Sequence, residues 1–220
     1  MNDKNFYLID DGFCFNEKNL LVYLRRKSYN PKIVRIKEYK DFVVSEINNI
    51  IKSISLLGDI VLVGVGTGGT IIADEIVKST NYNAVSFCFS QRIVKNQIVG
   101  YDYSICYEAL KSKKVILLDD VIYTGKTIAY FTKLLTAHDV EVIGCISIIS
   151  NKHACYDKKI ISAIELDYDI GNPFPVYSFR HLLLGEGEME EFDNNVNKKF
   201  FNQDKEYIDL IRSIRKKDGG

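Results

Sequence analysis

The chain has 220 residues, of which 46% are hydrophobic, and its 29 Lys and Arg residues balance its 29 Asp and Glu residues. This length suits a single domain, residues 1–220, with a substantial core. The neutral balance lacks the basic excess typical of a nucleic-acid-binding face, and no apolar run approaches the ~20 residues that span a bilayer. We therefore expect neither a nucleic-acid partner nor a membrane.

The cysteines indicate a reducing compartment. Their number is odd and no two have Cys-x-x-Cys spacing, which argues against a disulfide framework and a structural zinc site. They are Cys14, Cys88, Cys106, Cys145 and Cys155. The first residues also lack the basic region and apolar core of a secretory signal peptide, so we expect a cytoplasmic location.

The N-terminal part is expected to contain two short strands and a helix. Residues 12–15 and 20–24 are short apolar runs on either side of a polar stretch, which indicates two strands joined by a turn. Apolar residues recur at helical spacing from Asp41 to Leu57, which predicts an amphipathic helix leading into the middle of the chain.

Apolar runs alternate with helical patterns in the middle of the chain. This alternation predicts buried parallel strands in strand–helix–strand units. The expected strands are 59–63, 84–89, 115–118 and 140–149, and the expected helices are 70–79 and 127–138. We predict an α/β fold in which residues ~55–150 form a doubly wound, mostly parallel sheet.

The C-terminal part is predicted to hold two further strands and one helix. The strands cover 162–166 and 176–184, and the acidic segment 185–191 follows as a solvated loop. A charged helix is expected at 204–215. Its pattern fits either a solvated amphipathic helix or one that binds a partner.

A glycine-rich run, GVGTGG at residues 64–69, follows the first strand of the predicted core. It matches G-x-G-x-x-G, but a dinucleotide site also needs an acidic residue at the end of the next strand. That strand ends in FCFSQR, residues 87–92, without a carboxylate. Two interpretations remain: a tight strand-to-helix turn without a ligand, or a turn whose main-chain N–H groups bind an anionic oxygen.

A second run, LLDDVIYTGKT at residues 117–127, ends like a P-loop. The P-loop pattern G-x-x-x-x-G-K-[ST] requires glycine at position 120, where this chain has Asp120. A carboxylate there would repel the phosphates of a nucleotide, so we exclude a P-loop. The turn from Thr124 to Thr127 still opens a helix, whose N–H groups and dipole favour a phosphate dianion.

Asp119 and Asp120 stand just before this turn, at the end of an apolar strand. Carboxylates beside a phosphate site suit a ribose 5-phosphate, whose 2- and 3-hydroxyls would donate to Asp119 and Asp120 directly or through Mg²⁺. The alternative is that both side chains only cap the turn.

The stretch VILLDDVIYTGKT, residues 115–127, resembles the 5-phosphoribosyl-1-pyrophosphate (PRPP) motif of type I phosphoribosyltransferases. In that motif an apolar strand and two acidic residues precede a Thr-Gly-x-Thr/Ser phosphate loop. By position, residues 65–70 resemble the pyrophosphate loop of this family, and residues 91–103 resemble its mobile catalytic loop. The layout of the segments 91–103 and 175–184 most resembles orotate phosphoribosyltransferase. The resemblance implies a type I core with a small hood from residues 6–40 and 160–185.

This resemblance implies Mg²⁺-dependent transfer of 5-phosphoribose from PRPP to a nitrogenous base, with orotate as the expected base and pyrophosphate as the leaving group. It implies a homodimer in which the loop 91–103 serves the partner's site. Arg92 and Lys95 would close over the diphosphate, while Asp119 and Asp120 would be catalytic residues and the metal ligands. The implied PRPP-binding residues are Thr67, Gly68, Gly69, Asp119, Asp120, Val121, Ile122, Tyr123, Thr124, Gly125, Lys126 and Thr127, with Tyr123 and Lys126 at variable motif positions.

Departures from the orotate enzymes leave the base open. Gln91 stands where those enzymes carry an arginine, and the Asp-Arg pair that follows the fifth core strand in those enzymes is missing. The N-terminal Ser-Gly-x-x-Ser of the orotate enzymes is also missing. The alternatives are a phosphoribosyltransferase for a purine or a specialised base, and a non-catalytic PRPP-binding regulator on the same fold. The candidates near the base are Lys152, His153, Arg180 and His181.

Overall fold

The computed structural model places the chain in two compact units. The larger unit is Ile36–Asn172, and the smaller unit combines Met1–Arg35 with Pro173–Gly220. The residues that the structure describes are 4–10, 17–53, 60–87, 92–94, 97–99, 107–172, 174–178, 200–201 and 204–218.

In its described residues the larger unit contains a five-stranded sheet whose neighbouring strands are all parallel. The chain runs from the central strands outward to one edge and then to the other. The confirmed fold is therefore the predicted doubly wound α/β fold, and its topological switch point lies between β3 and β7. The strand order is β4 (Asn83–Phe87), β3 (Ile60–Val65), β7 (Lys114–Ile122), β8 (Glu141–Asn151) and β9 (Ile160–Leu166).

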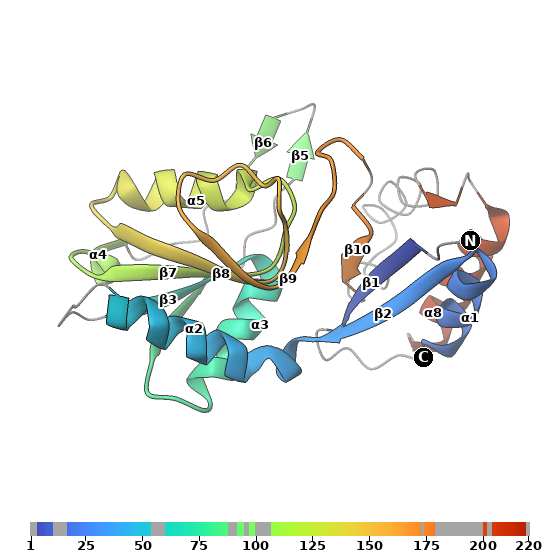
Figure 1. The fold of residues 1–220 in the computed structure, drawn as a ribbon, viewed down its shortest axis with the longest axis horizontal. Helices are drawn as coiled ribbons and strands as arrows, with labels where there is room; N and C mark the ends of the chain where they lie inside the picture. The colour runs from blue at the N-terminus through green and yellow to red at the C-terminus, as the bar shows by residue number, and fades with distance from the viewer. Residues whose placement is uncertain are drawn as a thin grey trace. The chain divides into compact units, whose positions relative to one another are not determined.

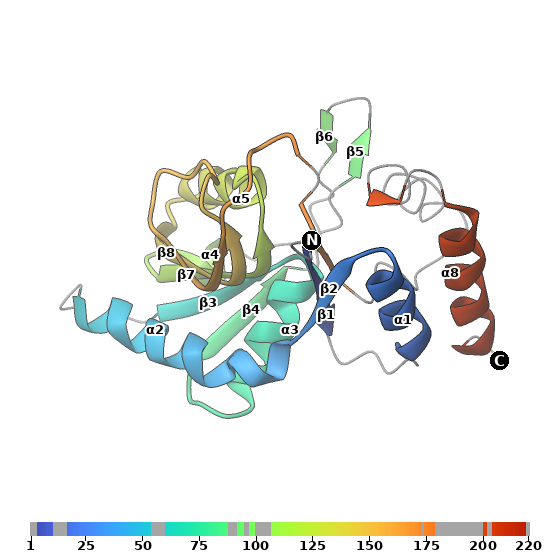
Figure 2. The ribbon, with the colours of Figure 1, turned by 45° about the vertical axis from the view of Figure 1, so that its right-hand side comes forward.

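Helices cover both faces of this sheet, as the predicted alternation requires. The helices α2 (Lys40–Ser53) and α3 (Gly66–Val77) lie along one face, and α5 (Lys126–Thr136) lies along the other (Figures 1 and 2). The described part of this unit also contains the antiparallel pair β5–β6. The remaining elements are η1 (Ile36–Tyr39), α4 (Tyr107–Leu110), β5 (Arg92–Val94) and β6 (Gln97–Val99).

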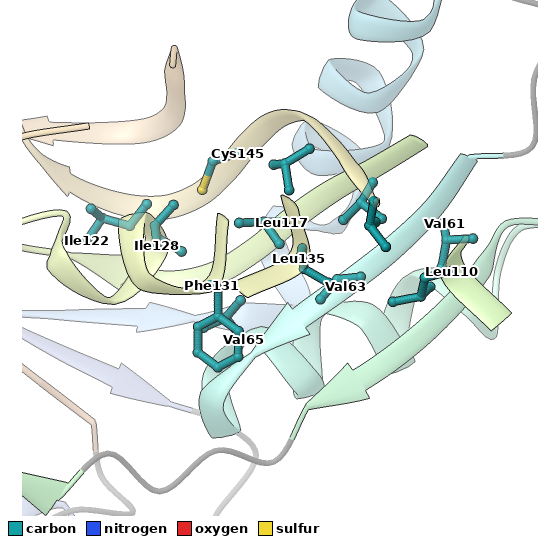
Figure 3. Packing of buried hydrophobic residues seen from close by; sticks show 13 residues of the cluster. Val61, Val63, Val65, Leu110, Leu117, Ile122, Ile128, Phe131, Leu135 and Cys145 are labelled. Carbon is teal, nitrogen blue, oxygen red and sulfur yellow. The ribbon is translucent and has the colours of Figure 1, made fainter. Parts of the chain in front are cut away.

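Buried apolar side chains fill the space between the sheet and α5. Alternate residues of a strand point to the same face, so every second residue of β3 and β7 can enter this core. Figure 3 shows side chains from the strands packed together with side chains from α5. The cluster includes Val61, Val63, Val65, Leu117 and Cys145 from the strands and Ile128, Phe131 and Leu135 from α5. This packing fixes the strand ends from which the two predicted turns start.

The smaller unit forms, in its described residues, a three-stranded parallel sheet in the order β10 (Val176–Ser178), β1 (Lys4–Asp10) and β2 (Tyr29–Arg35). The helix α1 (Lys18–Arg26) connects β1 to β2. Residues 160–172 of the predicted hood belong to the larger unit instead, and Ile160–Leu166 is the edge strand of its sheet.

The prediction of a strand at 20–24 is wrong, because these residues lie in α1. Leu20, Tyr23 and Leu24 are buried, whereas Val22 is 52% exposed. This i, i+3, i+4 spacing is that of a helix face. This helical spacing was not evident in the sequence, because apolar residues stand on both the buried and the exposed side of α1. The other predicted N-terminal strand, 12–15, lies outside the described residues.

The predicted C-terminal helix is confirmed as α8 (Lys205–Asp218), and its apolar stripe packs on its own unit. Tyr207, Ile211 and Ile214 are buried in a cluster that also contains Phe6 and Tyr23. The strand predicted at 176–184 is present as β10, and residues 179–184 lie outside the described part. None of the helices in the described ranges is long and apolar enough to cross a membrane.

A hydrogen-bonded tyrosine joins α1 to the residue that precedes α8. The Tyr23 hydroxyl donates to Asp204 Oδ2 at 2.9 Å, and Lys27 Nζ lies 2.5 Å from the same oxygen. Burial, and next the hydrogen bond to Asp204, raise the pKa of Tyr23 well above its ordinary value. Tyr23 therefore holds its proton more tightly in the folded chain than in the unfolded chain.

We expect the contribution of Tyr23 to folding stability to disappear at alkaline pH. Above pH ~10 the unfolded chain loses the Tyr23 proton while the folded chain keeps it, which favours unfolding. Tyr23→Phe should lower the free energy of unfolding by about 1 kcal/mol near neutral pH, from the lost hydrogen bond. Urea unfolding followed by circular dichroism should show this difference shrinking at about pH 11. An equal difference at both pH values would contradict the assignment.

Candidate phosphate-binding site

Two turns meet at the switch point of the larger unit's sheet. One follows β3 and opens α3, and the other follows β7 and opens α5. The two strands are parallel neighbours, with Gly64 opposite Leu118 in the ladder. The two predicted anion-binding turns therefore lie at the same edge of the sheet, where doubly wound folds bind their ligands.

The first turn is tight because α3 begins immediately after β3. Gly66 is the first residue of α3 and has φ +65°, a conformation that favours glycine. The helix thus starts four residues before Thr70, where the sequence predicted its start. The Thr70 hydroxyl donates to the Gly66 carbonyl at 2.7 Å. Val65 stands at the N-cap position and has no polar side chain to cap the helix. The first N–H groups and the dipole of α3 can therefore act on an anion beside the partly exposed Thr67.

Two glycines of this turn are required by packing. A Cβ on Gly64 would lie 2.6 Å from the carbonyl oxygen of Gly69. A Cβ on Gly69 would lie 2.1 Å from the carbonyl oxygen of Leu118. Backbone atoms this close could not move aside, so α3 can lie on β3 and β7 only if both positions are glycine. These two glycines follow from the fold, and evidence for a ligand must come from other residues.

Asp120 connects the two turns. A Cβ on Gly68 would lie 2.0 Å from Asp120 Cγ, so the carboxylate lies directly against the Cα of Gly68. Gly68 is in the first turn of α3, where a negative charge is favourable. The side chain of Asp120 can therefore support the start of α3 and still offer acceptors to the hydroxyls of a ligand.

Asp119 lies on the opposite face of β7, because successive strand side chains alternate. It stands opposite Ser147 of β8, and its Oδ1 accepts the N–H of Asp120 at 2.9 Å. Burial, and next the charge of Asp120, raise the pKa of Asp119 well above its ordinary value. Burial and Asp119 together raise the pKa of the Cys145 thiol. The charged form of Asp119 is therefore destabilised, and a nearby cation or hydroxyl donor would stabilise it.

Gly125 and Cys155 shape the second turn. Gly125 is the N-cap of α5 with φ +78°, and a Cβ there would lie 2.5 Å from the carbonyl oxygen of Cys155. The Cys155 N–H donates to the Thr124 carbonyl at 3.0 Å. The Lys126 N–H donates to Thr124 Oγ1 at 3.4 Å, and the Lys126 side chain is exposed. The segment after β8 therefore holds the turn in shape, which leaves the partly exposed Thr124 and Thr127 at the start of α5.

The backbone before this turn excludes a P-loop, in agreement with the sequence argument. A P-loop curls around phosphates before its Gly-Lys-Thr, whereas Asp120, Val121 and Ile122 belong to β7. Ile122 is 2% exposed and packs in the core beneath α5. At Ile122, therefore, only main-chain groups could contact a ligand.

Asp119 and Asp120 together have the chemistry to hold a magnesium ion. Mg²⁺ prefers oxygen ligands and is commonly held by one or two carboxylates together with substrate phosphates. Asp120 brings such oxygens to the first turn, Asp119 precedes it on the same strand, and a bound divalent cation would lower the raised pKa of Asp119. A metal site at this pair stays a prediction.

The predicted cations of the 91–103 loop are described only in part. Arg92 is the first residue of β5, which pairs with β6 in an antiparallel hairpin. Lys95 lies outside the described residues. Arg180 and His181, which were expected near the base, also lie outside them.

Lys152 and His153 share one carboxylate just after β8. Lys152 Nζ lies 3.2 Å from Asp167 Oδ2, and His153 Nε2 lies 2.8 Å from Asp167 Oδ1. The bond to His153, and next the bond to Lys152, lower the pKa of Asp167. The sequence did not indicate Asp167, because its partners Lys152 and His153 lie in a different segment of the chain. It did not indicate Cys155 either, because Cys155 contacts the turn at Thr124 through main-chain atoms.

A double-mutant cycle tests the contact between Asp120 and Gly68. Gly68→Ala should lower the free energy of unfolding by about 1–3 kcal/mol, because the new methyl group displaces the Asp120 side chain. In an Asp120→Ala background the same substitution should cost much less, which gives a coupling energy of about 1 kcal/mol or more. Gly64→Ala is the matched control, since it meets only backbone atoms and Asp120→Ala should not rescue it. Additive effects for Gly68→Ala would refute the contact.

Asp119→Asn should stabilise the chain without ligand at about pH 8, because it removes a half-buried charge whose pKa is raised but keeps the oxygen that accepts the Asp120 N–H. A folded pKa raised above the unfolded value gives stability that is lost as pH rises, so the gain should shrink as pH falls toward ~4. A rise in melting temperature of about 2–4 °C corresponds to ~1 kcal/mol at this size. Differential scanning calorimetry measures this, with Asp74→Asn on the exposed side of α3 as control. A pH-independent difference would contradict the raised pKa.

Comparison with known proteins identifies the family of the chain. The family model of the phosphoribosyl transferase domain matches residues 35–178. Similar solved folds include a hypoxanthine phosphoribosyltransferase from Staphylococcus aureus, with 17% identity over 59% of this chain and 74% of that one (TM-score 0.45). An adenine phosphoribosyltransferase from Thermoanaerobacter pseudethanolicus has 14% identity over 59% and 81% (TM-score 0.45). A hypothetical protein from Neisseria gonorrhoeae with bound ppGpp has 15% identity over 77% and 93% (TM-score 0.46). Because the family model covers more than half of the sequence, this chain belongs to the phosphoribosyl transferase domain family.

Proposed function

We propose that the chain is a Mg²⁺-dependent phosphoribosyltransferase that transfers 5-phosphoribose from PRPP to a nitrogenous base. The observation that carries this proposal is the position of Asp120, which lies against Gly68 in one turn while belonging to the strand that opens the other. PRPP has a phosphate at one end of its ribose and a diphosphate at the other. A ligand of that layout matches two anion-binding turns with carboxylates between them.

Each turn then has a distinct part of PRPP to bind. The 5-phosphate would lie at the start of α5, against the main chain and hydroxyls of Thr124–Thr127. The ribose hydroxyls would donate to Asp119 and Asp120. The diphosphate would lie at the start of α3, against the main chain of Thr67, Gly68 and Gly69. In this arrangement the helix dipoles of α3 and α5 both favour the negative ends of the ligand.

The chemical step is displacement of pyrophosphate at C1 of the ribose. A nitrogen of the base donates an electron pair to C1, and the C1–O bond breaks with its electrons leaving on the pyrophosphate. Positive charge develops on the sugar, so the carboxylates of Asp119 and Asp120 are well placed to hold and stabilise it. Mg²⁺, when bound, neutralises the departing diphosphate. Arg92 and Lys95 are proposed to close over that group and exclude water.

The proposed base is orotate, on the layout of the sequence around the PRPP motif and the 91–103 loop. A purine or a specialised base is the alternative, because the base-side residues depart from the orotate pattern. Lys152, His153 and Asp167 are the described polar residues that we propose to lie near the base. They follow β8 and β9 at the same edge of the sheet as the two turns. A homodimer in the cytoplasm completes the proposal. The homodimer rests on the family resemblance, and the location rests on the cysteine pattern and the sequence of the first residues.

The direct test is pyrophosphate release from PRPP and Mg²⁺ with a panel of bases, orotate first and then uracil, hypoxanthine, guanine and adenine. Turnover with one base identifies the substrate. Tight binding of Mg²⁺–PRPP without turnover of any base would indicate a PRPP-binding regulator rather than an enzyme. No binding of PRPP under any condition would refute the proposed function.

Asp120→Asn should weaken PRPP binding by about 10- to 100-fold, the loss expected when a charged acceptor of a ligand hydrogen bond becomes neutral. Asn keeps the size of the side chain that lies against Gly68, so folding should be preserved. Isothermal titration calorimetry with Mg²⁺–PRPP measures the affinity, and Asp209→Asn on the exposed side of α8 is the control. Unchanged affinity for Asp120→Asn would rule out its assignment to the ribose.

A further inference from the structure

The side chain of Tyr123 turns away from the phosphate turn and binds the segment that follows β9. Its hydroxyl donates to the carbonyl oxygen of Asn172 at 2.7 Å and accepts the N–H of Gly171 at 2.9 Å. The carbonyl oxygen of Asp169 lies 3.3 Å away. A tyrosine hydroxyl has one proton, and the shorter contact to Asn172 is its principal acceptor. All three partners are main-chain groups, so the contact depends on the shape of the segment.

The same segment is held at its other end by Asn151, the last residue of β8. Asn151 Nδ2 donates to the Tyr168 carbonyl at 2.8 Å, and the Tyr168 N–H donates to Asn151 Oδ1 at 3.3 Å. Asn151 is 2% exposed, whereas Asp169, Ile170 and Gly171 are exposed. Residues 168–172 thus form a surface segment with one attachment to the end of β8 and one to Tyr123.

Tyr123 is well placed to connect this segment with a ligand. It is flanked by Ile122, which is fixed in the core, and by Thr124, the first residue of the proposed phosphate turn. An anion that orders Thr124–Thr127 must also restrict the backbone of Tyr123, and through its hydroxyl the position of Gly171 and Asn172.

We propose that Tyr123 is a positioning residue that couples phosphate binding at Thr124–Thr127 to the ordering of residues 169–172. The proposal rests on the proposed function, because it takes the 5-phosphate of PRPP as the bound anion. Coupling between two sites is reciprocal. Phosphate binding therefore strengthens the attachment of residues 169–172 to Tyr123. The attachment strengthens phosphate binding by the same factor. Residues 169–172 follow β9, whose carboxyl end lies at the same sheet edge as the two turns.

Hydrogen exchange of the amides of residues 169–172 tests the coupling, on the full chain with and without Mg²⁺–PRPP. In the wild type the ligand should slow exchange by about fivefold or more, the ratio that one net hydrogen bond gives. In Tyr123→Phe this ligand-induced slowing should disappear. The affinity for PRPP should decrease by the same factor as the ligand-induced slowing of exchange. The KM for PRPP should increase accordingly, while kcat changes less.

Two further variants separate the coupling from general effects on folding. Tyr82→Phe removes a tyrosine hydroxyl that donates to Asn48 at 2.7 Å in the same unit, and it should behave as the wild type does. Gly171→Ala disturbs the other side of the contact through the backbone alone, because Gly171 has φ +114° and an added Cβ would meet no atom within 4 Å. It should abolish the ligand-induced slowing as Tyr123→Phe does.

The outcomes distinguish the coupling from the proposed function. Binding of PRPP with undiminished slowing in Tyr123→Phe would overturn the coupling and leave the proposed function intact. Equal losses in Tyr123→Phe and Tyr82→Phe would also overturn it, since the effect would then be global. Absence of PRPP binding by the wild type would overturn both proposals.

Discussion

The approach of α3 to the strand β7 is the contact on which the site of the larger unit depends. At Gly69 the helix lies on the carbonyl of Leu118, and one residue earlier Gly68 lies on the carboxylate of Asp120. A side chain at Gly69 would push α3 away from β7, and one at Gly68 would displace the carboxylate of Asp120. The start of α3 and the acidic pair are therefore brought together by the same packing that closes the core, which makes their geometry insensitive to loop motion.

This constraint divides the glycine-rich turn into a structural part and a part available to a ligand. Gly64 and Gly69 are required by backbone contacts alone, so their presence would be expected even in a chain without a ligand. Gly68 differs, because its neighbour is the carboxylate of Asp120. A smaller residue at position 120 would leave room for a side chain at position 68. The informative feature is thus a carboxylate placed at a helix start, and the glycines only permit it.

The sequence predicted the core of the larger unit well because buried parallel strands are short apolar runs and helices have a clear period. It placed the start of α3 too late, at Thr70, because glycines are poor helix formers and only the packing against β7 makes them helical. It predicted a strand where α1 forms, since the exposed Val22 interrupts the polar face of that helix and makes the apolar run continuous. The contacts of Tyr123 and Cys155 could not be predicted, because their partners are main-chain atoms of segments distant in the chain.

Asp119 gives a physical reason to connect the acidic pair with a ligand. Burial and the neighbouring Asp120 both destabilise its charged form. Opposite Asp119, the fully buried hydroxyl of Ser147 has no hydrogen-bond partner among the described residues. Both features reduce folding stability, and an apolar pair at these positions would pack against α5 without either penalty. Strained or poorly satisfied groups of this kind concentrate at functional sites, where a bound partner supplies the missing interactions. A cap would need only Asp120, so the second carboxylate, half-buried on the other face of β7, is the residue that a purely structural account leaves unexplained.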